Sequence, residues 1–250
     1  MQVKESWIKQ IYLLRGDEHI SYEQFYSLIT EKAERVSGAQ GVRGVKCTIT
    51  AEPPPRCSVI PFRKEKIAAV SVWIDSATAE GGPLEAFEAP ELLEVDGRIR
   101  GFEVTEAVPV SYEKDWEDKK MTPGVGLLTL FKRREGLSRE EFLRRWHESH
   151  TPLSLKFHPL WNYNRNVVER EIGTNRTAGR NTADENTIEG IVEEHFRERK
   201  DLLNVFRFFG PPWITLWRMM RVLFDSRSFI DYPTMEPYLI TERWIQTPEG

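Results

Sequence analysis

The chain has 250 residues, of which 40% are apolar and 30% are charged, and its formal net charge is −4. This length and apolar content suffice for one large domain or two small ones. The slightly acidic balance argues against nucleic acid as a partner, because phosphate binding requires a basic surface.

The cysteines indicate a reducing compartment. Cys47 and Cys57 are ten residues apart, with no histidine nearby at metal-binding spacing. A disulfide across this short loop fits the spacing, but two reduced thiols are the simpler interpretation. Residues 1–7 are polar and lack the apolar stretch of a secretory signal. We therefore expect a cytoplasmic protein.

The segment 202–224 is rich in Leu, Phe, Trp and Met and is long enough for a membrane span. It contains Arg207, Arg218 and Arg221, however, and an arginine in mid-membrane costs several kcal/mol. It also contains the pair Pro211–Pro212. We expect no membrane span, but a buried or pocket-covering helical region that breaks at the prolines.

A short pattern occurs twice along the chain. Residues 11–25 and residues 128–142 each contain an apolar run, a polar turn and then Ser-x-x-Gln or Ser-x-x-Glu. The last part is a capping box, in which the serine and the residue three positions on cap a helix reciprocally. The capping pairs are Ser21 with Gln24 and Ser138 with Glu141.

The remaining patterns predict the same element order in both halves. In the first half we expect strands over 9–15, 42–51, 67–75 and 102–112 and helices over 22–36 and 84–93. In the second half we expect strands over 126–132, 162–171, 188–196 and 238–245, helices over 139–150 and within 197–224, and an exposed loop over 172–187. The order β-α-β-β-α-β is that of a ferredoxin-like unit.

The predicted fold class is α+β. A single βαββαβ sheet carries helices on one face only, so its other face needs a cover. Two such sheets in one chain can cover each other. We therefore predict two tandem ferredoxin-like units that form an intramolecular α+β barrel, with a degenerate first unit over 1–120 and a second unit over 121–250.

The helix predicted over 139–150 contains the first candidate for chemistry. Phe142, Trp146 and His150 fall on one stripe at helical spacing, with His147 at its edge. His150 should therefore point inward just before the helix ends at Pro152. A histidine in an apolar cleft can exchange protons near neutral pH, although a core histidine with one satisfied hydrogen bond fits the same pattern.

The strand predicted over 188–196 contains the next candidates. Glu193 and His195 share one face of this strand, where they could pair with each other or meet His150. A solvated or barrel-facing polar stripe fits equally well. On the strand over 162–171, Asn164 and Asn166 lie on one face and Tyr163 on the other, and either face could line a pocket.

Several well-known site patterns are missing from the sequence. It contains no Gly-x-Gly-x-x-Gly, no phosphate-binding Gly-x-x-x-x-Gly-Lys and no Gly-x-Ser-x-Gly. His147 and His150 are three apart, but no His-Glu-x-x-His provides a third ligand. We therefore expect no bound metal.

The second half resembles the EthD family, part of the dimeric α+β barrel superfamily. The resemblance rests on Gly136–His150 (GLSREEFLRRWHESH), on Ile188–Glu193 (IEGIVE) and on Asp225–Asp231 (DSRSFID), taken as an acidic turn before the last strand. Glu189 stands where that family has Asp. The first half is similar only through Ser21–Phe25 and the strand order.

The resemblance implies an enzyme that needs no cofactor and acts on a small hydrophobic compound, aromatic or polyketide-like, through a histidine acid or base. Decarboxylases, dehydratases, cyclases and isomerases of this kind occur in the superfamily. On this chain the histidine is His150, with Glu193 or His195 tuning it. Apolar and polar walls are expected from the following residues: Trp146, His147, Trp161, Tyr163, Asn164, Asn166, Phe209 and Trp213.

Two other functions remain open. One is an oxidoreductase or monooxygenase component of a degradation pathway, with or without a haem-like guest. The other is a non-catalytic protein that binds a small molecule. A homodimer is compatible with all three.

Overall fold

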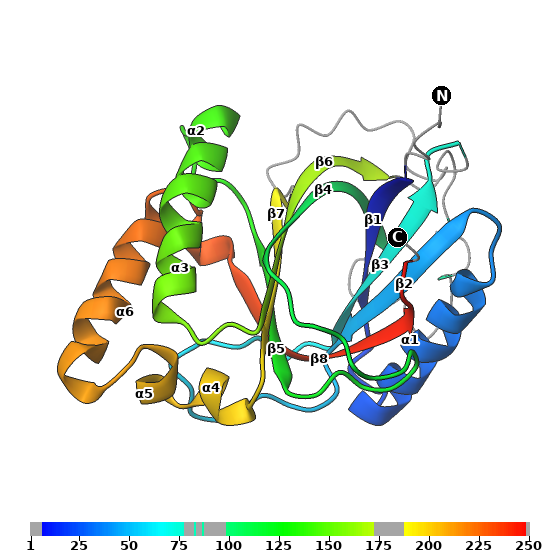
Figure 1. The fold of residues 1–250 in the computed structure, drawn as a ribbon, viewed down its shortest axis with the longest axis horizontal. Coiled ribbons are helices and arrows are strands. Elements are labelled where there is room, and N and C mark those ends of the chain that lie inside the picture. Colours follow the sequence, from blue (N-terminus) through cyan, green and yellow to red (C-terminus); the bar gives the residue numbers. More distant parts are fainter. Residues whose placement is uncertain (1–6, 78–82, 84–86, 88–98, 173–187, 249–250) are drawn as a thin grey trace.

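The computed structural model describes residues 7–77, 83, 87, 99–172 and 188–248. Its centre is a closed eight-stranded barrel with the strand order β1-β3-β2-β8-β5-β7-β6-β4, in which all neighbours are antiparallel (Figure 1). The strands are β1 (Trp7–Arg15), β2 (Val42–Ile49), β3 (Ile67–Asp75), β4 (Arg100–Val110), β5 (Val125–Phe131), β6 (Asn162–Ile172), β7 (Gly190–Phe196) and β8 (Glu236–Gln246). The predicted α+β class and barrel are confirmed.

The strand order is the same in the two halves of the chain. The first half contributes β4-β1-β3-β2 and the second half β8-β5-β7-β6. In both halves, the fourth strand of the half lies beside the first, followed by the third and the second. The pairs β2–β8 and β4–β6 join the halves and close the barrel. Closure pairs both edges of each four-stranded sheet, which would otherwise expose unpaired backbone groups.

All eight strands lie where the sequence pattern predicts them, within a few residues at each end. The first capping box is confirmed: the Ser21 side chain accepts from the Gln24 amide, and Gln24 reaches back to the Ser21 amide. At the second, Ser138 caps the Glu141 amide, but the Glu141 carboxylate binds Arg144 and Arg145 instead. The helix predicted over 84–93 and the loop 173–187 fall outside the described residues, Phe87 excepted.

Helices lie on the outside of the barrel, in two groups (Figure 1). The helix α1 (Tyr22–Ser37) covers one side. The other side carries α2 (Arg139–Arg144), the π-helix η3 (Arg145–His150) and α3 (Thr151–Phe157), with α4 (Arg199–Leu203), α5 (Val205–Phe208) and α6 (Pro212–Arg227). A short 3-10 helix, η4 (Tyr232–Thr234), leads into β8.

Two of the helix predictions are wrong. The helix over 139–150 does not end at Pro152, because η3 runs directly into α3 and Pro152 lies in the first turn of α3. Asp225, expected in a turn, lies inside α6, whose cap is Ser228. The break of the aromatic region at Pro211 is confirmed, since Pro211 caps α6.

The apolar residues form separate cores inside and outside the barrel. Inside, one end is filled by a cluster that includes Ile11, Phe102, Leu128 and Ile191. Outside, one cluster lies under α1, and two more lie under the helices of the second half. Because successive side chains of a strand point to opposite faces, every second side chain points into the barrel and the others point toward a helix layer.

Candidate functional site

His150 lies at the end of the π-helix η3 and contacts α6. Its Nδ1 is 2.8 Å from Oδ2 of Asp225, and its ring packs 5.1 Å from the ring of Phe229. The His150 side chain is 16% exposed, so it is mostly but not fully buried. Phe142 and Trp146, on the same stripe, are fully buried, as predicted. π-Helical turns are often found at functional sites.

The Asp225 carboxylate fixes the tautomer of His150. Burial acts to raise the pKa of Asp225, but hydrogen bonds from His150 and from Ser149 (2.5 Å) outweigh burial and lower this pKa below its usual range. An ionised carboxylate only accepts hydrogen bonds, so Nδ1 of His150 must carry the proton. The neutral ring then has its lone pair on Nε2, which is the nitrogen able to take a proton from a ligand.

Ser154 lies one turn after His150 and approaches the same nitrogen. Its Oγ is 3.4 Å from Nε2, which is long for a hydrogen bond between O–H and N. Ser154, His150 and Asp225 thus resemble the nucleophile, base and carboxylate of a hydrolytic triad. The serine is 2% exposed, however, and a nucleophile must be reachable by its substrate. We interpret Ser154 as a packing residue whose weak contact leaves Nε2 available.

Glu193 and His195 do not meet His150. Both side chains point from β7 into the barrel, on the opposite face of the sheet, as the barrel-facing alternative predicted. Glu193 is 3% exposed; its carboxylate is 3.1 Å from Lys46 Nζ and 3.5 Å from Lys9 Nζ, and it accepts a hydrogen bond from Thr48 at 2.8 Å. Burial acts to raise the pKa of Glu193, but the two ammonium groups lower this pKa to about 2.

The barrel interior therefore has an apolar end and an end filled by a cluster of buried charged side chains. Lys9 also binds Glu106 at 2.6 Å, and Lys46 is 3.4 Å from Glu242. Burial opposes the charge on Lys46, but Glu193 and Glu242 outweigh it and raise the pKa of this lysine. A buried cluster of charges that are paired with one another holds its own groups in place and fits a structural role.

The predicted polar walls divide between the two faces of β6. Asn164 donates to Glu106 at 2.8 Å, and Asn166 accepts from Lys9 at 2.9 Å, so both belong to the barrel interior. Tyr163 points the other way, into the apolar cluster beneath α2 and α3. Burial raises the pKa of Tyr163. The two faces cannot line one pocket.

The predicted aromatic walls are also dispersed. Trp146 and Phe209 are buried under the helices of the second half, on the same side as His150. Trp161 packs 5.0 Å from Tyr112 and 6.0 Å from His195, on the barrel side. The interpretation of Trp213 as a pocket wall is wrong, because its side chain is 85% exposed on the outer face of α6.

The histidines His147 and His195 both contain an unpaired buried nitrogen. His147 Nε2 has no hydrogen-bond partner, and burial and Arg165 lower the pKa of His147 to about 4. His195 Nε2 contacts the Pro123 carbonyl at 2.8 Å, and its Nδ1 is unpaired. Burial also lowers the pKa of His195. Both rings are therefore neutral near pH 7.

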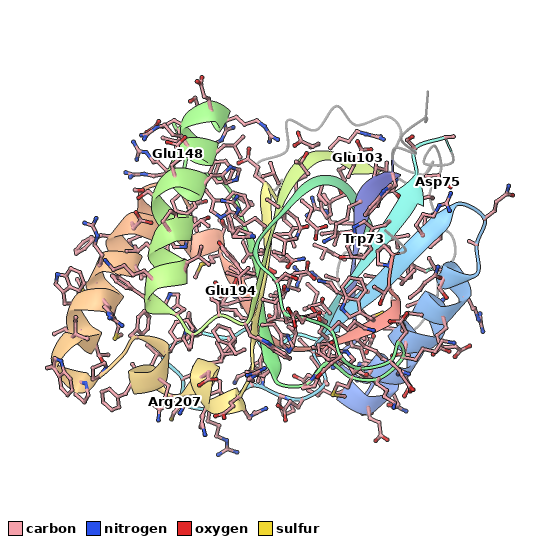
Figure 2. All side chains as sticks on the ribbon, viewed as in Figure 1. Trp73, Asp75, Glu103, Glu148, Glu194 and Arg207 are labelled. Atoms are coloured by element: carbon pink, nitrogen blue, oxygen red, sulfur yellow. The ribbon has the colours of Figure 1, made fainter. Side chains whose placement is uncertain are left out.

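Two residues of the helix side were not predicted as site residues. The first is Asp225. The second is Glu194, the neighbour of Glu193 on β7, which points toward the helix layer. Its register partners are Leu127 on β5 and Tyr163 on β6, and Figure 2 places it between the strands and the helices α3 and α6.

Glu194 is a carboxyl group in apolar surroundings. Within the described part of the chain it has no hydrogen bond or ion pair, and burial raises the pKa of Glu194 to about 7. A carboxylic acid with a pKa near neutrality can act as a proton donor or acceptor under cellular conditions. The sequence contained an indication of this buried carboxyl. Neighbouring residues of a strand point to opposite faces, so when Glu193 faces the barrel interior, Glu194 must face the helix layer.

The carboxyl of Glu194 should make stability depend on pH. Between the ordinary pKa of about 4.3 and the raised value near 7, the native state keeps the proton that the unfolded chain loses. The free energy of unfolding should therefore fall by roughly 2–3 kcal/mol between pH 4.5 and pH 8 relative to that of Glu194→Gln. Urea denaturation of both proteins at the two pH values measures this difference, with exposed Glu148→Gln as the control. If the free energy of unfolding changed with pH by the same amount in the wild type and in Glu194→Gln, the raised pKa of Glu194 would be contradicted.

Two other kinds of site are missing from the described part of the chain. Among the described residues, no group of three His, Cys, Asp or Glu side chains is arranged to hold a metal ion. Nor does any helix within those residues have the length and apolar character needed to cross a membrane. Cys47 and Cys57 are both free, as expected.

The fold is that of an α+β barrel protein. The whole chain aligns with the crystal structure of an anthrone oxidase-like protein, with a TM-score of 0.59, 13% identity and 98% of that chain covered. Over 98% of its length it also aligns with a candidate monooxygenase from Fusobacterium nucleatum, with a TM-score of 0.51, 8% identity and 94% of that chain covered. A comparison with curated protein sequences gives no match.

Within this class, the EthD domain model matches residues 134–215, which contain η3, α3, β6 and β7. The resemblance to the EthD family is therefore confirmed over this part of the chain. His150 lies inside the matched segment, and its partner Asp225 lies ten residues beyond its end.

Proposed function

We propose that the protein is a cofactor-independent enzyme for a small hydrophobic compound of aromatic or polyketide type, and that His150 removes a proton from it. The observation that supports this most strongly is the 2.8 Å contact of His150 with Asp225, which leaves Nε2 as a base at a partly exposed position. The EthD match around His150 supports the same site.

We also infer that the two halves are tandem ferredoxin-like units, 1–120 and 121–250, and that only the second carries a site. The repeated strand order supports this, and so does the EthD match, which falls wholly within the second half. Ala33, which aligns with His150 in the first repeat, is fully buried in α1 and cannot exchange a proton.

The chemistry would proceed in two stages. Nε2 of His150 accepts the proton of an acidic C–H or O–H bond, and Asp225 stabilises the imidazolium that forms. The electron pair of the broken bond remains on the substrate, where an aromatic or polyketide system delocalises it. From this anion the proton can return elsewhere, as in an isomerase, or a leaving group can depart, as in a lyase.

Oxidation is the second candidate, and the name of the anthrone oxidase-like neighbour favours it. The same anion can react with dioxygen. For anthrone, one molecule of substrate and one of dioxygen give anthraquinone and water, so the reaction balances without another reductant. Oxygen uptake with anthrone as the probe separates the two branches: stoichiometric uptake supports the oxidase, and exchange of the methylene hydrogens with D₂O without uptake supports the non-oxidative reaction. No turnover of any aromatic probe would favour a binding protein.

Asp225 is expected to act by positioning His150. Asp225→Asn should lower kcat by about 100-fold or more, since an amide can hold the ring in the wrong tautomer and cannot stabilise the imidazolium. KM and the urea midpoint should change little. Ser149→Ala is the matched control, because it removes the other hydrogen bond to Asp225 and leaves the His150 contact intact. An equal loss of kcat in Asp225→Asn and Ser149→Ala would contradict this role.

A further inference from the structure

The outer face of α6 exposes an unusual amount of apolar surface. Trp213 is 85% exposed, Leu216 70%, Trp217 58%, Met220 39% and Phe224 63%. The helix lies at the edge of the molecule in Figure 1, with η3 and α3 on its inner side. Isolated exposed apolar residues are common on proteins, but five of them on one face of a single helix indicate an interaction surface.

The spacing along α6 suits another helix. Trp213, Trp217, Met220 and Phe224 follow one another at intervals of four, three and four residues. This is the alternation of the a and d positions that form the seam between two coiled-coil helices. Such a seam is a narrow stripe, and its natural partner is a second stripe of the same width.

The exposed area is sufficient for a stable dimer. An aromatic side chain can bury about 150–250 Å². With Phe206 of α5, which is 50% exposed, the apolar face of α6 therefore offers on the order of 800 Å². This is about the area that each partner buries in a standard protein–protein interface, and it exceeds the largest apolar patch of a typical monomer.

The composition of this face also fits a protein partner. Interface centres are enriched in Trp, Phe, Met and Arg and depleted in Lys and Glu. The seam itself has no carboxylate, and the charged residues next to it in sequence are Arg218, Arg221 and Asp225, the last of which binds His150 on the inner side of the helix. Arg221 is exposed beside the seam, whereas Arg218 turns inward, over the ring of Phe157.

We propose that the protein forms a two-fold dimer in which α6 packs antiparallel against α6 of a second copy. Trp213 would contact Phe224 of the partner subunit, and Trp217 would contact Met220 of the partner subunit. Each contact then occurs twice, as two-fold symmetry requires. The inner side of the same helix carries Asp225, so the dimer would also hold in place the helix that orients His150.

Light scattering after size exclusion tests the proposal on the full chain. The wild type should elute with about twice the subunit mass of 29.2 kDa. Trp213→Glu and Phe224→Lys should each raise the dimer dissociation constant by about 100-fold or more. Trp7→Glu, which changes a 46% exposed tryptophan on β1, is the matched control and should leave the dimer unchanged.

Mixing the two variants tests the antiparallel register. In the heterodimer, the carboxylate introduced by Trp213→Glu in one copy faces the ammonium group introduced by Phe224→Lys in the other. One native Trp–Phe contact also remains, so the mixture should recover the dimer mass. Far-ultraviolet circular dichroism checks that each variant is folded.

Three results would overturn the proposal: a wild type that is monomeric at about 100 µM, well above the dissociation constant of a standard interface, variants that dimerise normally, or a mixture that stays monomeric. Monomeric wild type that sediments with phosphatidylglycerol vesicles would identify a membrane surface as the true occupant of the α6 face.

Discussion

Replacing His150 by Gln is expected to lower kcat by roughly 10²- to 10⁴-fold, the usual contribution of a general base. Glutamine fills a similar volume and can still hydrogen-bond Asp225, but the lone pair of its amide nitrogen is delocalised into the carbonyl and does not accept a proton. The rate at which anthrone disappears in the presence of dioxygen, measured by absorbance, gives this value for the oxidative branch. The rate at which its methylene hydrogens exchange in D₂O without dioxygen gives it for the non-oxidative branch.

Ser154→Ala is the control for the His150 variant. If Ser154 only packs against His150, its loss should leave kcat within a few-fold of the wild-type value. A large loss in Ser154→Ala, together with release of an alcohol from an ester probe, would instead indicate a hydrolytic triad. Full activity in folded His150→Gln would remove His150 from the mechanism.

The second large effect concerns stability. Glu193→Gln should lower the free energy of unfolding by about 1.5–3 kcal/mol, because Lys46, Lys9 and Thr48 lose a shared buried carboxylate, while Lys9 keeps Glu106 and Lys46 keeps Glu242. Domains of ordinary stability have about 5–15 kcal/mol in all, so this loss is a large share of the total. Urea denaturation followed by circular dichroism measures the change.

The comparison for this variant is Glu103→Gln, on the outside of the barrel (Figure 2). Glu103 pairs with Arg170 at 2.5 Å, but the arginine side chain is 58% exposed. Breaking an ion pair in contact with water costs at most about 1 kcal/mol. If Glu193→Gln and Glu103→Gln both lower the free energy of unfolding by no more than about 1 kcal/mol, the charged cluster inside the barrel does not stabilise the fold.

The strands could be predicted from the sequence because their signals are local. Ile67–Asp75 is a run of β-branched and small apolar residues, and its observed bounds equal the predicted ones. Barrel closure followed from one physical requirement, the covering of each sheet's open face. The ends of the helices were harder to predict. A proline usually marks the end of a helix, but Pro152 lies in the first turn of α3 instead.

The candidate site was predicted only in part. The helical spacing correctly placed His150 at the end of a buried stripe, but nothing local indicated that Asp225, seventy-five residues later, lies against it. Strand alternation predicted that Glu193 and His195 share a face, yet it could not say which face. That choice depends on Lys9 and Lys46, which come from strands of the other half.

The apolar segment 202–224 shows a different limit. Its composition predicted burial, and Leu202, Phe208 and Phe209 are indeed buried. The apolar residues of the α6 seam beyond Pro211 are exposed instead, since one side of that helix already packs on the domain and the seam lies on the other. Hydrophobicity alone cannot distinguish a core within one subunit from an interface between two.

In the proposed mechanism, proton transfer occurs on the helix side of the second half, and the charged barrel interior is structural. Exchange of the methylene hydrogens of anthrone for deuterium, followed by NMR in D₂O without oxygen, distinguishes the two regions. We predict that the wild type accelerates exchange, that His150→Gln does not, and that Glu193→Gln retains the acceleration in proportion to its folded fraction. An exchange rate in His150→Gln equal to that of the wild type, or loss of the acceleration in folded Glu193→Gln, would rule out this division of roles.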